Sequence, residues 1–268
     1  MTRPIADVPD ILASEGRLAE ELAGRRPAVF LDYDGTLAPI TVDPAEAGLP
    51  ARTRAALEVL ARQCPVAIVS GRDLDDVATM AGVEGVAYAG SHGLDIAGPA
   101  GRHTHGEEHI DALDRAEAEL EAALAEVAGA RIERKRFAIA VHSREVGPAD
   151  QAAVEAAVGQ VASAHPRLRL TGGKRVAELR PAVDWDKGRA VLWLLESLGL
   201  DDAAALPIYV GDDVTDEDAF AALADRGLCL VVRGEDDTRP TAAHGALADT
   251  SAVAELLERL SALVDGGR

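Results

Sequence analysis

The chain has 268 residues, of which 48% are hydrophobic and 3% aromatic, and its formal net charge is -19. This length allows one large domain, or a domain with a smaller insertion, around a core of aliphatic side chains. The negative charge argues against general binding to nucleic acid or to an anionic membrane. A small anionic substrate is compatible with it, because a site can be locally positive inside an acidic protein.

The cysteines and the N-terminal segment indicate the compartment. Cys64 and Cys229 lie in or beside apolar runs without a neighbouring cysteine, which is typical of buried free thiols in a reducing compartment. Residues 1–24 contain no uninterrupted apolar stretch, so we expect no signal peptide. We expect no membrane span either, because no later segment is long enough to cross a bilayer. These features predict a cytoplasmic protein.

Short apolar runs alternate with helical patterns along most of the chain. Runs in which nearly every residue is apolar predict strands buried on both faces, as in a parallel sheet. These runs are residues 28–31, 65–69, 86–89, 207–210 and 228–232. Helical patterns occupy residues 51–62, 73–80, 187–198 and 216–224. The alternation predicts an α/β fold with a doubly wound, Rossmann-like parallel sheet, in which ligands bind beyond the carboxyl ends of the strands.

The middle of the chain follows another pattern. Its expected elements, in the order αββαββ, are residues 107–127, 131–135, 137–142, 148–164, 167–171 and 175–179. This order predicts an inserted α+β cap domain with a sheet of its own. We therefore divide the chain into a catalytic core, formed by residues 1–104 and 177–268, and a cap formed by residues 105–176.

Two carboxylates follow the first buried strand, in the segment DYDGTL at residues 32–37. Burying unpaired ions is costly, whereas a metal ion and a phosphate group would offset that cost. Asp32 can attack phosphorus as a nucleophile, and Asp34 can protonate the leaving alcohol and later activate water. Gly35 lets the backbone approach phosphate oxygens closely. The alternative interpretation is that the two aspartates cap a helix or fill a turn.

Two further segments offer groups for a phosphate. Ser70-Gly71-Arg72 follows the second buried strand, where a hydroxyl and backbone N–H groups suit a phosphate oxygen; an ordinary turn is the alternative. Lys187 lies in the first turn of a helix, where the helix dipole disfavours a cation unless an anion binds there. It can therefore neutralise a transferring phosphoryl group, or it can be an exposed lysine paired with Asp184.

A cluster of carboxylates follows the strand that ends at residue 210. Thr215 and Asp218 have the spacing of a capping box, which explains residues 216–218 at the start of a helix. The cap does not explain Asp212 and Asp213. Because magnesium prefers carboxylate oxygens, Asp212 and Asp32 together predict a Mg2+ site.

Taken in chain order, these four segments resemble the motifs of the haloacid dehalogenase-like phosphatase superfamily. The resemblance implies that Asp32 is the nucleophile and that Asp34 is the acid and base. It implies that Ser70 and Lys187 bind the phosphate.

The same resemblance implies a metal site. Mg2+ would be bound by the Asp32 side chain, the Asp34 carbonyl oxygen and Asp212. Asp213 and Asp216 are expected to surround and support these ligands.

Longer segments resemble the trehalose-6-phosphate phosphatase family. They are GDDVTDEDAF at residues 211–220, AGSHGL at 89–94, ELRP at 178–181, Glu133-x-Lys135 and His142-x-Arg144. The similarity runs from about residue 27 to about residue 232. It implies hydrolysis of trehalose 6-phosphate to trehalose and phosphate through an aspartyl-phosphate, in trehalose biosynthesis. A trehalose-phosphate synthase is expected as a transient partner.

The residues of the expected cap also have a physical basis as a sugar site. Glu133 and Lys135 would share one face of a strand, as would His142 and Arg144, and all four can hydrogen-bond sugar hydroxyls. The alternative is a solvated sheet face with cross-strand ion pairs. The remaining substrate-binding candidates are Tyr33, Gly35, Arg72, His92 and Glu178. For Arg72 and His92 the alternative is that they connect the core and the cap.

Two other functions fit parts of the pattern. One is a phosphatase for another phosphorylated sugar or glycosyl-glycerate, which phosphate release from a panel of sugar phosphates distinguishes. The other is a catalytically silent subunit that binds a sugar phosphate. Such a subunit usually lacks a nucleophile or a metal ligand, whereas all the expected ones are present in this sequence.

Overall fold

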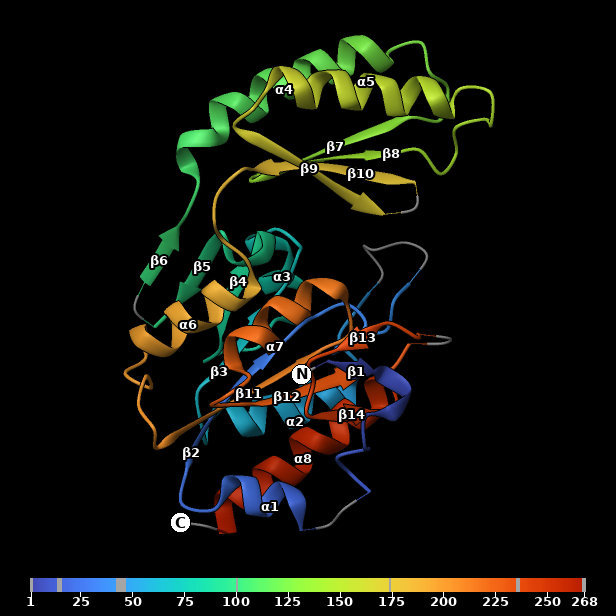
Figure 1. The fold of residues 1–268 in the computed structure, drawn as a ribbon. Helices are drawn as coiled ribbons and strands as arrows, with labels where there is room; N and C mark the ends of the chain where they lie inside the picture. Colours follow the sequence, from blue (N-terminus) through green and yellow to red (C-terminus); the bar gives the residue numbers. More distant parts are fainter. Residues whose placement is uncertain are drawn as a thin grey trace. The chain divides into compact units, whose positions relative to one another are not determined.

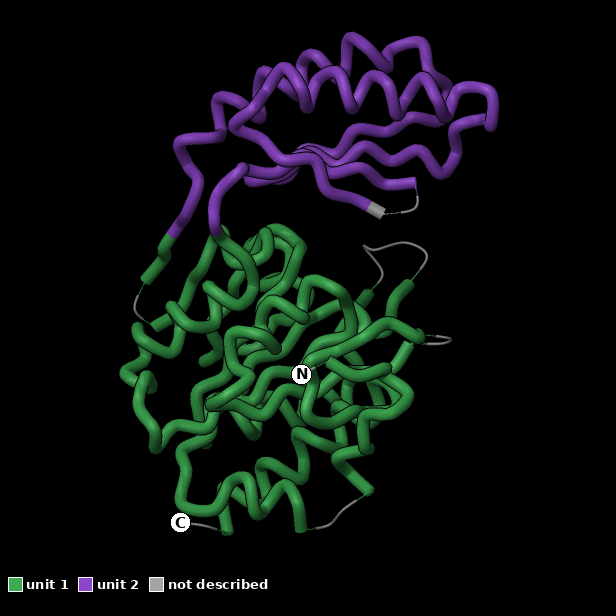
Figure 2. The backbone as a smooth tube through the Cα atoms, in the orientation of Figure 1, with its two compact units in different colours: residues 1–103, 185–268 green, residues 104–184 purple. Residues whose placement is uncertain are grey.

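The structure is a computed structural model that describes residues 2–13, 16–41, 47–99, 101–173, 175–234 and 237–266. The chain forms two compact units, which are coloured separately in Figure 2. The first unit consists of Met1–His103 and Trp185–Arg268, and the second of Thr104–Asp184. Among the described residues, the first unit contains an eight-stranded sheet and a separate two-stranded sheet, and the second unit contains a four-stranded sheet.

Strands and helices alternate along the first unit (Figure 1). Its strands are β1 (Arg3–Pro4), β2 (Arg26–Leu31), β3 (Val66–Val69), β4 (Ala87–Gly90), β5 (Asp95–Gly98), β6 (Gly101–Thr104), β11 (Ala205–Gly211), β12 (Leu228–Val232), β13 (Pro240–Thr241) and β14 (Gly245–Leu247). Its helices are α1 (Arg17–Leu22), α2 (Ala51–Ala61), α3 (Leu74–Ala81), α6 (Lys187–Ser197), α7 (Glu217–Leu223) and α8 (Thr250–Gly266), with the 3-10 helices η1 (Ile5–Asp7), η3 (Ser91–Gly93) and η5 (Val214–Asp216).

The large sheet has the order β14-β12-β11-β2-β3-β4-β5-β6. Neighbouring strands from β14 to β4 are parallel, and β5 runs antiparallel to β4. The antiparallel extension by β5, and β6 beyond it, was not predicted from the sequence. The parallel, doubly wound α/β core was predicted and is confirmed.

Alternation along the central strands creates a hydrophobic core on each face of this sheet. In β2, Val29 and Leu31 belong to the core that includes residues of α1, α2, α3 and α8. Ala28 and Phe30 belong to the opposite core, which includes residues of α6 and α7. Burial on both faces explains why these strands are continuous apolar runs in the sequence.

The second unit is an α+β layer. Its elements are η4 (Glu107–His109), α4 (Ile110–Leu124), β7 (Arg131–Lys135), β8 (Ala138–His142), α5 (Gln151–Ala164), β9 (Leu168–Gly173) and β10 (Val176–Pro181). The strands form an antiparallel sheet in the order β7-β8-β10-β9. Apolar residues of α4 and α5 pack against one sheet face, which includes Ile139 and Leu179. The opposite face is polar.

The boundaries of this unit differ from the predicted ones, 105 and 176. Strand β10 pairs with both β8 and β9, so it cannot belong to the other sheet, and the unit continues to Asp184. The unit begins at Thr104. Among the helices that the structure describes, none has the length and apolar character needed to cross a bilayer.

Two leucines of the second unit test the position of its core. Leu120 on α4 is 0% exposed, whereas Leu170 on β9 is 46% exposed. We expect Leu120→Ala to lower the free energy of unfolding by about 2–5 kcal/mol, because it leaves a cavity. The matched change Leu170→Ala should cost below about 1 kcal/mol. Urea denaturation followed by circular dichroism measures both, and equal losses would contradict the packing described above.

Candidate active site

Three sequence segments with polar side chains meet at the carboxyl ends of central strands in the large sheet. Asp32 follows β2, Ser70 follows β3 and Asp212 follows β11. These strands are adjacent and parallel, in the order β11-β2-β3, so their carboxyl ends lie side by side. The sheet therefore brings together residues that are up to 180 positions apart in the chain.

Lys187 adds a buried positive charge at these strand ends. It is 2% exposed, and its Nζ donates to Asp32 Oδ1 at 2.8 Å and to Asp216 Oδ1 at 2.7 Å. The start of α6 is fixed by Asp186, whose side chain accepts a hydrogen bond from the Arg189 N–H at 2.8 Å. Lys187 is therefore not the exposed lysine of the alternative interpretation.

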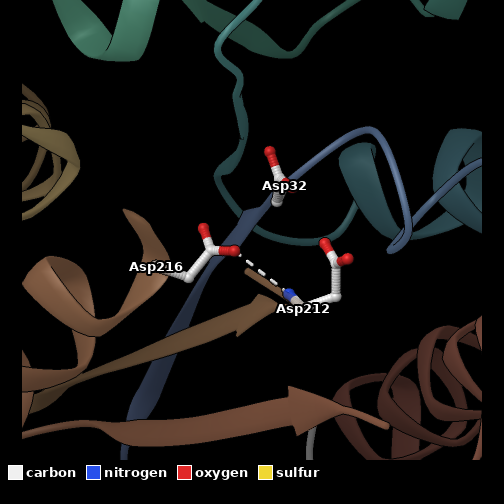
Figure 3. A group of neighbouring side chains, drawn as sticks. All are labelled: Asp32, Asp212 and Asp216. Carbon is white, nitrogen blue, oxygen red and sulfur yellow. Dashed lines mark hydrogen bonds between the residues drawn. The ribbon is translucent and has the colours of Figure 1, made fainter. Parts of the chain in front are cut away.

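Asp216 organises the loop after β11. Its Oδ1 accepts hydrogen bonds from the Tyr209 hydroxyl, at 2.7 Å, and from Lys187. Its Oδ2 accepts from the backbone N–H groups of Asp212, at 3.0 Å (Figure 3), and of Asp213, at 2.9 Å. Asp213 and Asp216 thus form the capping box that the sequence assigned to Thr215 and Asp218. The capping box is therefore determined by the buried hydrogen bonds that Asp216 accepts, and the spacing of Thr215 and Asp218 did not reveal it.

The carboxylates of Asp32, Asp212 and Asp216 form an acidic cluster (Figure 3). One oxygen from each lies within 4.8 Å of the others, a geometry that can hold a metal ion. When ionised, the three carboxylates and Lys187 carry three negative charges and one positive charge, so two negative charges remain. An all-oxygen donor set with this excess suits a hard divalent cation such as Mg2+.

Burial and mutual repulsion perturb these groups. Burial raises the pKa of Asp32 well above its ordinary value, Lys187 opposes this shift, and Asp216 and Asp212 add to it. Burial also raises the pKa of Asp212, to about 7, with Asp216 contributing repulsion. For Lys187, burial acts to lower the pKa, but Asp216 and Asp32 outweigh it and raise the pKa. A cation at the cluster would favour ionised carboxylates.

Asp34 forms a bidentate ion pair with Arg72. The guanidinium donates from Nε to Asp34 Oδ2 and from Nη2 to Asp34 Oδ1, both at 2.6 Å, and it lies over the Tyr33 ring at 5.7 Å. Arg72, expected to bind substrate, contacts the expected acid and base. Tyr33, also expected to bind substrate, is buried in the core with its hydroxyl donating to the Ala47 carbonyl at 2.8 Å.

The other candidates of the first unit lie around the same strand ends. Ser70 is buried, and its Oγ accepts from the Arg72 N–H at 3.2 Å. Gly35 has a φ of +76°, which favours glycine, and a Cβ there would overlap the Asp212 carboxylate. His92 lies next to Gly71, described below.

The candidates of the second unit are found on the polar face of its sheet. His142 Nε2 and Glu133 Oε2 are 2.7 Å apart, and Lys135 Nζ donates to Glu178 Oε1 at 3.1 Å. Cross-strand pairs therefore link the predicted residues, as the alternative interpretation expected. Arg144 is different: β8 ends at His142, so Arg144 lies exposed in the following turn and does not share the strand face.

Three residues around these sites were not predicted. Tyr209 was detectable as a phenol inside an otherwise apolar strand. Arg180 is part of the ELRP segment, and its Nε lies 3.2 Å from Glu178 Oε2. Arg239 comes from a distant loop and donates to the Asp212 carbonyl oxygen while its Nε contacts Asp237 at 2.9 Å. No sequence pattern indicated that contact.

Comparisons with known proteins identify the family of this chain. A family model described as trehalose-phosphatase matches residues 30–251. Trehalose-phosphate phosphatase of Mycobacterium marinum is 45% identical over 264 residues, covering 97% of this chain and 67% of that protein.

Solved structures show the same fold. A trehalose-6-phosphate phosphatase related protein superposes with a TM-score of 0.76 at 25% identity, covering 90% of this chain and 100% of that one. A haloacid dehalogenase-like hydrolase from Bacteroides thetaiotaomicron gives a TM-score of 0.63 at 15% identity, covering 88% of this chain and 100% of that one, and supports the fold alone. The chain belongs to the trehalose-phosphatase family, a phosphatase family with the haloacid dehalogenase-like fold.

Proposed function

We propose that this chain hydrolyses trehalose 6-phosphate to trehalose and inorganic phosphate through an aspartyl-phosphate on Asp32. The observation that carries the proposal is the buried contact of Lys187 with Asp32 and Asp216 at the carboxyl ends of the strands. The proposed nucleophile, a cation that can neutralise the phosphoryl group and an acidic cluster meet there, and this supports a phosphatase mechanism. An association with a trehalose-phosphate synthase and a cytoplasmic location stay predictions from the sequence.

Asp32 is the proposed nucleophile. One carboxylate oxygen forms a bond to phosphorus, and the bond between phosphorus and the sugar oxygen breaks. Lys187, which already contacts Asp32 Oδ1, neutralises the phosphoryl oxygens, with Ser70 as a hydrogen-bond donor. Water then attacks phosphorus, which releases inorganic phosphate and restores the Asp32 carboxylate.

Asp34 is the proposed acid and base. It gives a proton to the leaving sugar oxygen and later takes a proton from the attacking water. Arg72 donates one hydrogen bond to each carboxylate oxygen of Asp34, so each oxygen keeps acceptor capacity for the sugar hydroxyl or for water.

Mg2+ is the proposed cofactor. The Asp32 and Asp212 side chains and the Asp34 carbonyl oxygen would hold it, and it would neutralise charge on the phosphate. Asp216 belongs to the acidic cluster, but its oxygens already accept four hydrogen bonds from described residues, about the capacity of a carboxylate. We therefore assign Asp216, with Asp213, to supporting the loop.

The polar sheet face of the second unit is proposed to bind the sugar. Glu133, Lys135 and Glu178 lie on this face, and each can exchange its ion pair for hydrogen bonds to hydroxyls. Gly35 remains a proposed point of backbone contact with the phosphate.

The experiment that tests the proposal is phosphate release from a panel of phosphorylated sugars, with Mg2+ and with EDTA. We expect trehalose 6-phosphate to be the best substrate and EDTA to stop the reaction. Asp32→Asn should abolish turnover, because an amide oxygen is a poor nucleophile, whereas the exposed Asp225→Asn should leave it unchanged. Normal turnover by Asp32→Asn would end the covalent mechanism, and a preference for another sugar would reassign the substrate.

The stability of the metal-free protein should depend on Asp212. Its pKa is about 7 when folded, against an ordinary value of 3.8, so between these values the folded state binds a proton that the unfolded state has lost. The free energy of unfolding therefore falls as pH rises through this window. Asp212→Asn removes this contribution, so the Tm of the variant should fall less between about pH 4 and about pH 7.

Mg2+ provides the second half of this test. It binds the deprotonated carboxylate, so it should raise the Tm of the unmodified protein more at about pH 7 than at about pH 4. Asp212→Asn should lose this gain, and Asp225→Asn should keep it. An equal gain in all three proteins would remove Asp212 from the metal site.

Substitutions in the two units should change kcat/KM differently for substrates with and without the sugar. Glu133→Ala, Lys135→Ala or Glu178→Ala removes hydrogen bonds worth about 1.5–3 kcal/mol each, or roughly ten- to over a hundredfold in kcat/KM for trehalose 6-phosphate. Hydrolysis of p-nitrophenyl phosphate, which lacks the sugar, should be nearly unchanged. Lys187→Ala should damage both substrates, and the exposed Glu155→Ala neither. Equal losses on both substrates in the first three variants would mean that those residues only support the fold.

A further inference from the structure

The segment Ser91–Gly93, which forms η3, has an unusual backbone. Its three consecutive residues have φ angles of 50°, 57° and 90°. Glycine adopts such values readily, but Ser91 and His92 do so at a cost. Strained conformations of this kind persist only where the surrounding structure holds them, and they cluster at functional sites.

One side of η3 is tied to the loop that follows β3. The Ser91 N–H donates to the Arg72 carbonyl oxygen at 2.6 Å, and the His92 N–H donates to the Ser70 carbonyl oxygen at 2.8 Å. The Ser91 hydroxyl also donates to Asp73 Oδ1 at 2.8 Å. The η3 backbone thus donates hydrogen bonds to the loop that carries Ser70, which is proposed to bind phosphate.

The His92 ring completes this side. A Cβ on Gly71 would lie 2.8 Å from His92 Cε1 and 2.9 Å from Nε2, which is closer than side chains pack. The ring therefore lies directly against the Ser70-Gly71 peptide. It limits how far that peptide can move, and Gly71 is required because the ring occupies the space of a side chain.

The other side of η3 is tied to α6. Trp185 Nε1 donates to the Gly93 carbonyl oxygen at 2.7 Å. A Cβ on Gly93 would overlap the Cβ of Ala190, so backbone and helix are in close contact there. Because α6 begins with Lys187, the same short segment touches both the Ser70 loop and the helix that carries the buried lysine.

We infer that η3 is a spacer that sets the position of Ser70 relative to Lys187, and that His92 is a positioning residue in it. This inference rests on the proposed function of Ser70 and Lys187 as phosphate ligands. It replaces the expectation that His92 binds the substrate. A displacement of about 1 Å between such groups can cost as much as a hundredfold in rate. Because Ser70 and Lys187 are proposed to bind the phosphate, which all substrates share, a change in η3 should slow all substrates alike.

The test compares His92→Asn and His92→Gly. Both variants tolerate a positive φ and lack the ring. We expect each to lose roughly tenfold in kcat/KM, equally for trehalose 6-phosphate and for p-nitrophenyl phosphate, and to raise the inhibition constant of inorganic phosphate several-fold. His103→Asn is the matched control, because His103 lies on the edge strand β6, stacked on Trp193, and should change neither.

A double variant guards against a loss of folding. Gly71→Ala should lower activity because its Cβ meets the ring, and Gly71→Ala with His92→Gly should be no worse than His92→Gly alone. A loss confined to trehalose 6-phosphate would mean that His92 binds the sugar. Unchanged phosphate inhibition in both His92 variants, or additive losses in the double variant, would also overturn the inference. Full activity of Ser70→Ala and Lys187→Ala would instead refute the proposed function on which it rests.

Discussion

The site depends on one buried ammonium group. Lys187 is enclosed between Asp32 and Asp216, and removing any member of such a buried set leaves an uncompensated charge that costs about 3–5 kcal/mol. The contact joins three elements that are distant in the chain: the end of β2, the start of α6 and the loop after β11. The geometry of the candidate site and its local stability therefore have the same origin. A phosphate that draws Lys187 toward itself leaves the two carboxylates without part of their compensating charge, which another cation would then have to supply.

Asp216 explains how neighbouring carboxylates can have different tasks. It accepts hydrogen bonds from a lysine, a phenol and two backbone N–H groups, so its charge is compensated by the protein. Asp212 is oriented by that same network, yet its own carboxylate keeps a raised pKa because it is partly buried beside Asp216. A carboxylate that is fixed in place but poorly compensated is well suited to bind a cation. Asp216 accepts these four hydrogen bonds, so its oxygens are occupied, whereas the Asp212 carboxylate can still bind a ligand.

The sequence predicts the parts of this molecule in which local pattern and burial agree. β2 and β11 are buried on both faces, so their apolar runs identified them as strands in the sequence. The carboxylates that follow them could therefore be placed together at the carboxyl ends of these strands. Strand alternation could also have placed Tyr33 on the face opposite Asp32 and Asp34, but the motif resemblance drew it into the site. β5 and β6 were missed because they are short, lie at the sheet edge and include polar residues such as Asp95 and His103.

Side-chain partners were the least predictable feature. The ion pair between Arg72 and Asp34 joins residues 38 positions apart, and only the adjacency of β2 and β3 makes it possible. The capping box was misassigned because spacing alone cannot register that Asp216 is buried beside Lys187 and Tyr209. Likewise, Arg144 was placed on a strand that ends two residues earlier.

The ion pairs of the two units also differ in how deeply they are buried. In the first, charges are buried, so each contact is strong and mispairing is costly, which suits the fixed demands of phosphoryl transfer. In the second, the side chains of Glu133, Lys135 and Glu178 are 39%, 23% and 16% exposed, so water reaches their ion pairs more than it reaches Lys187. Such pairs cost less to separate than fully buried ones. In the proposed function, this face exchanges its ion pairs for hydrogen bonds to sugar hydroxyls at a smaller cost. The buried Lys187 cluster, in contrast, cannot be rearranged unless another charged group replaces the partner that is lost.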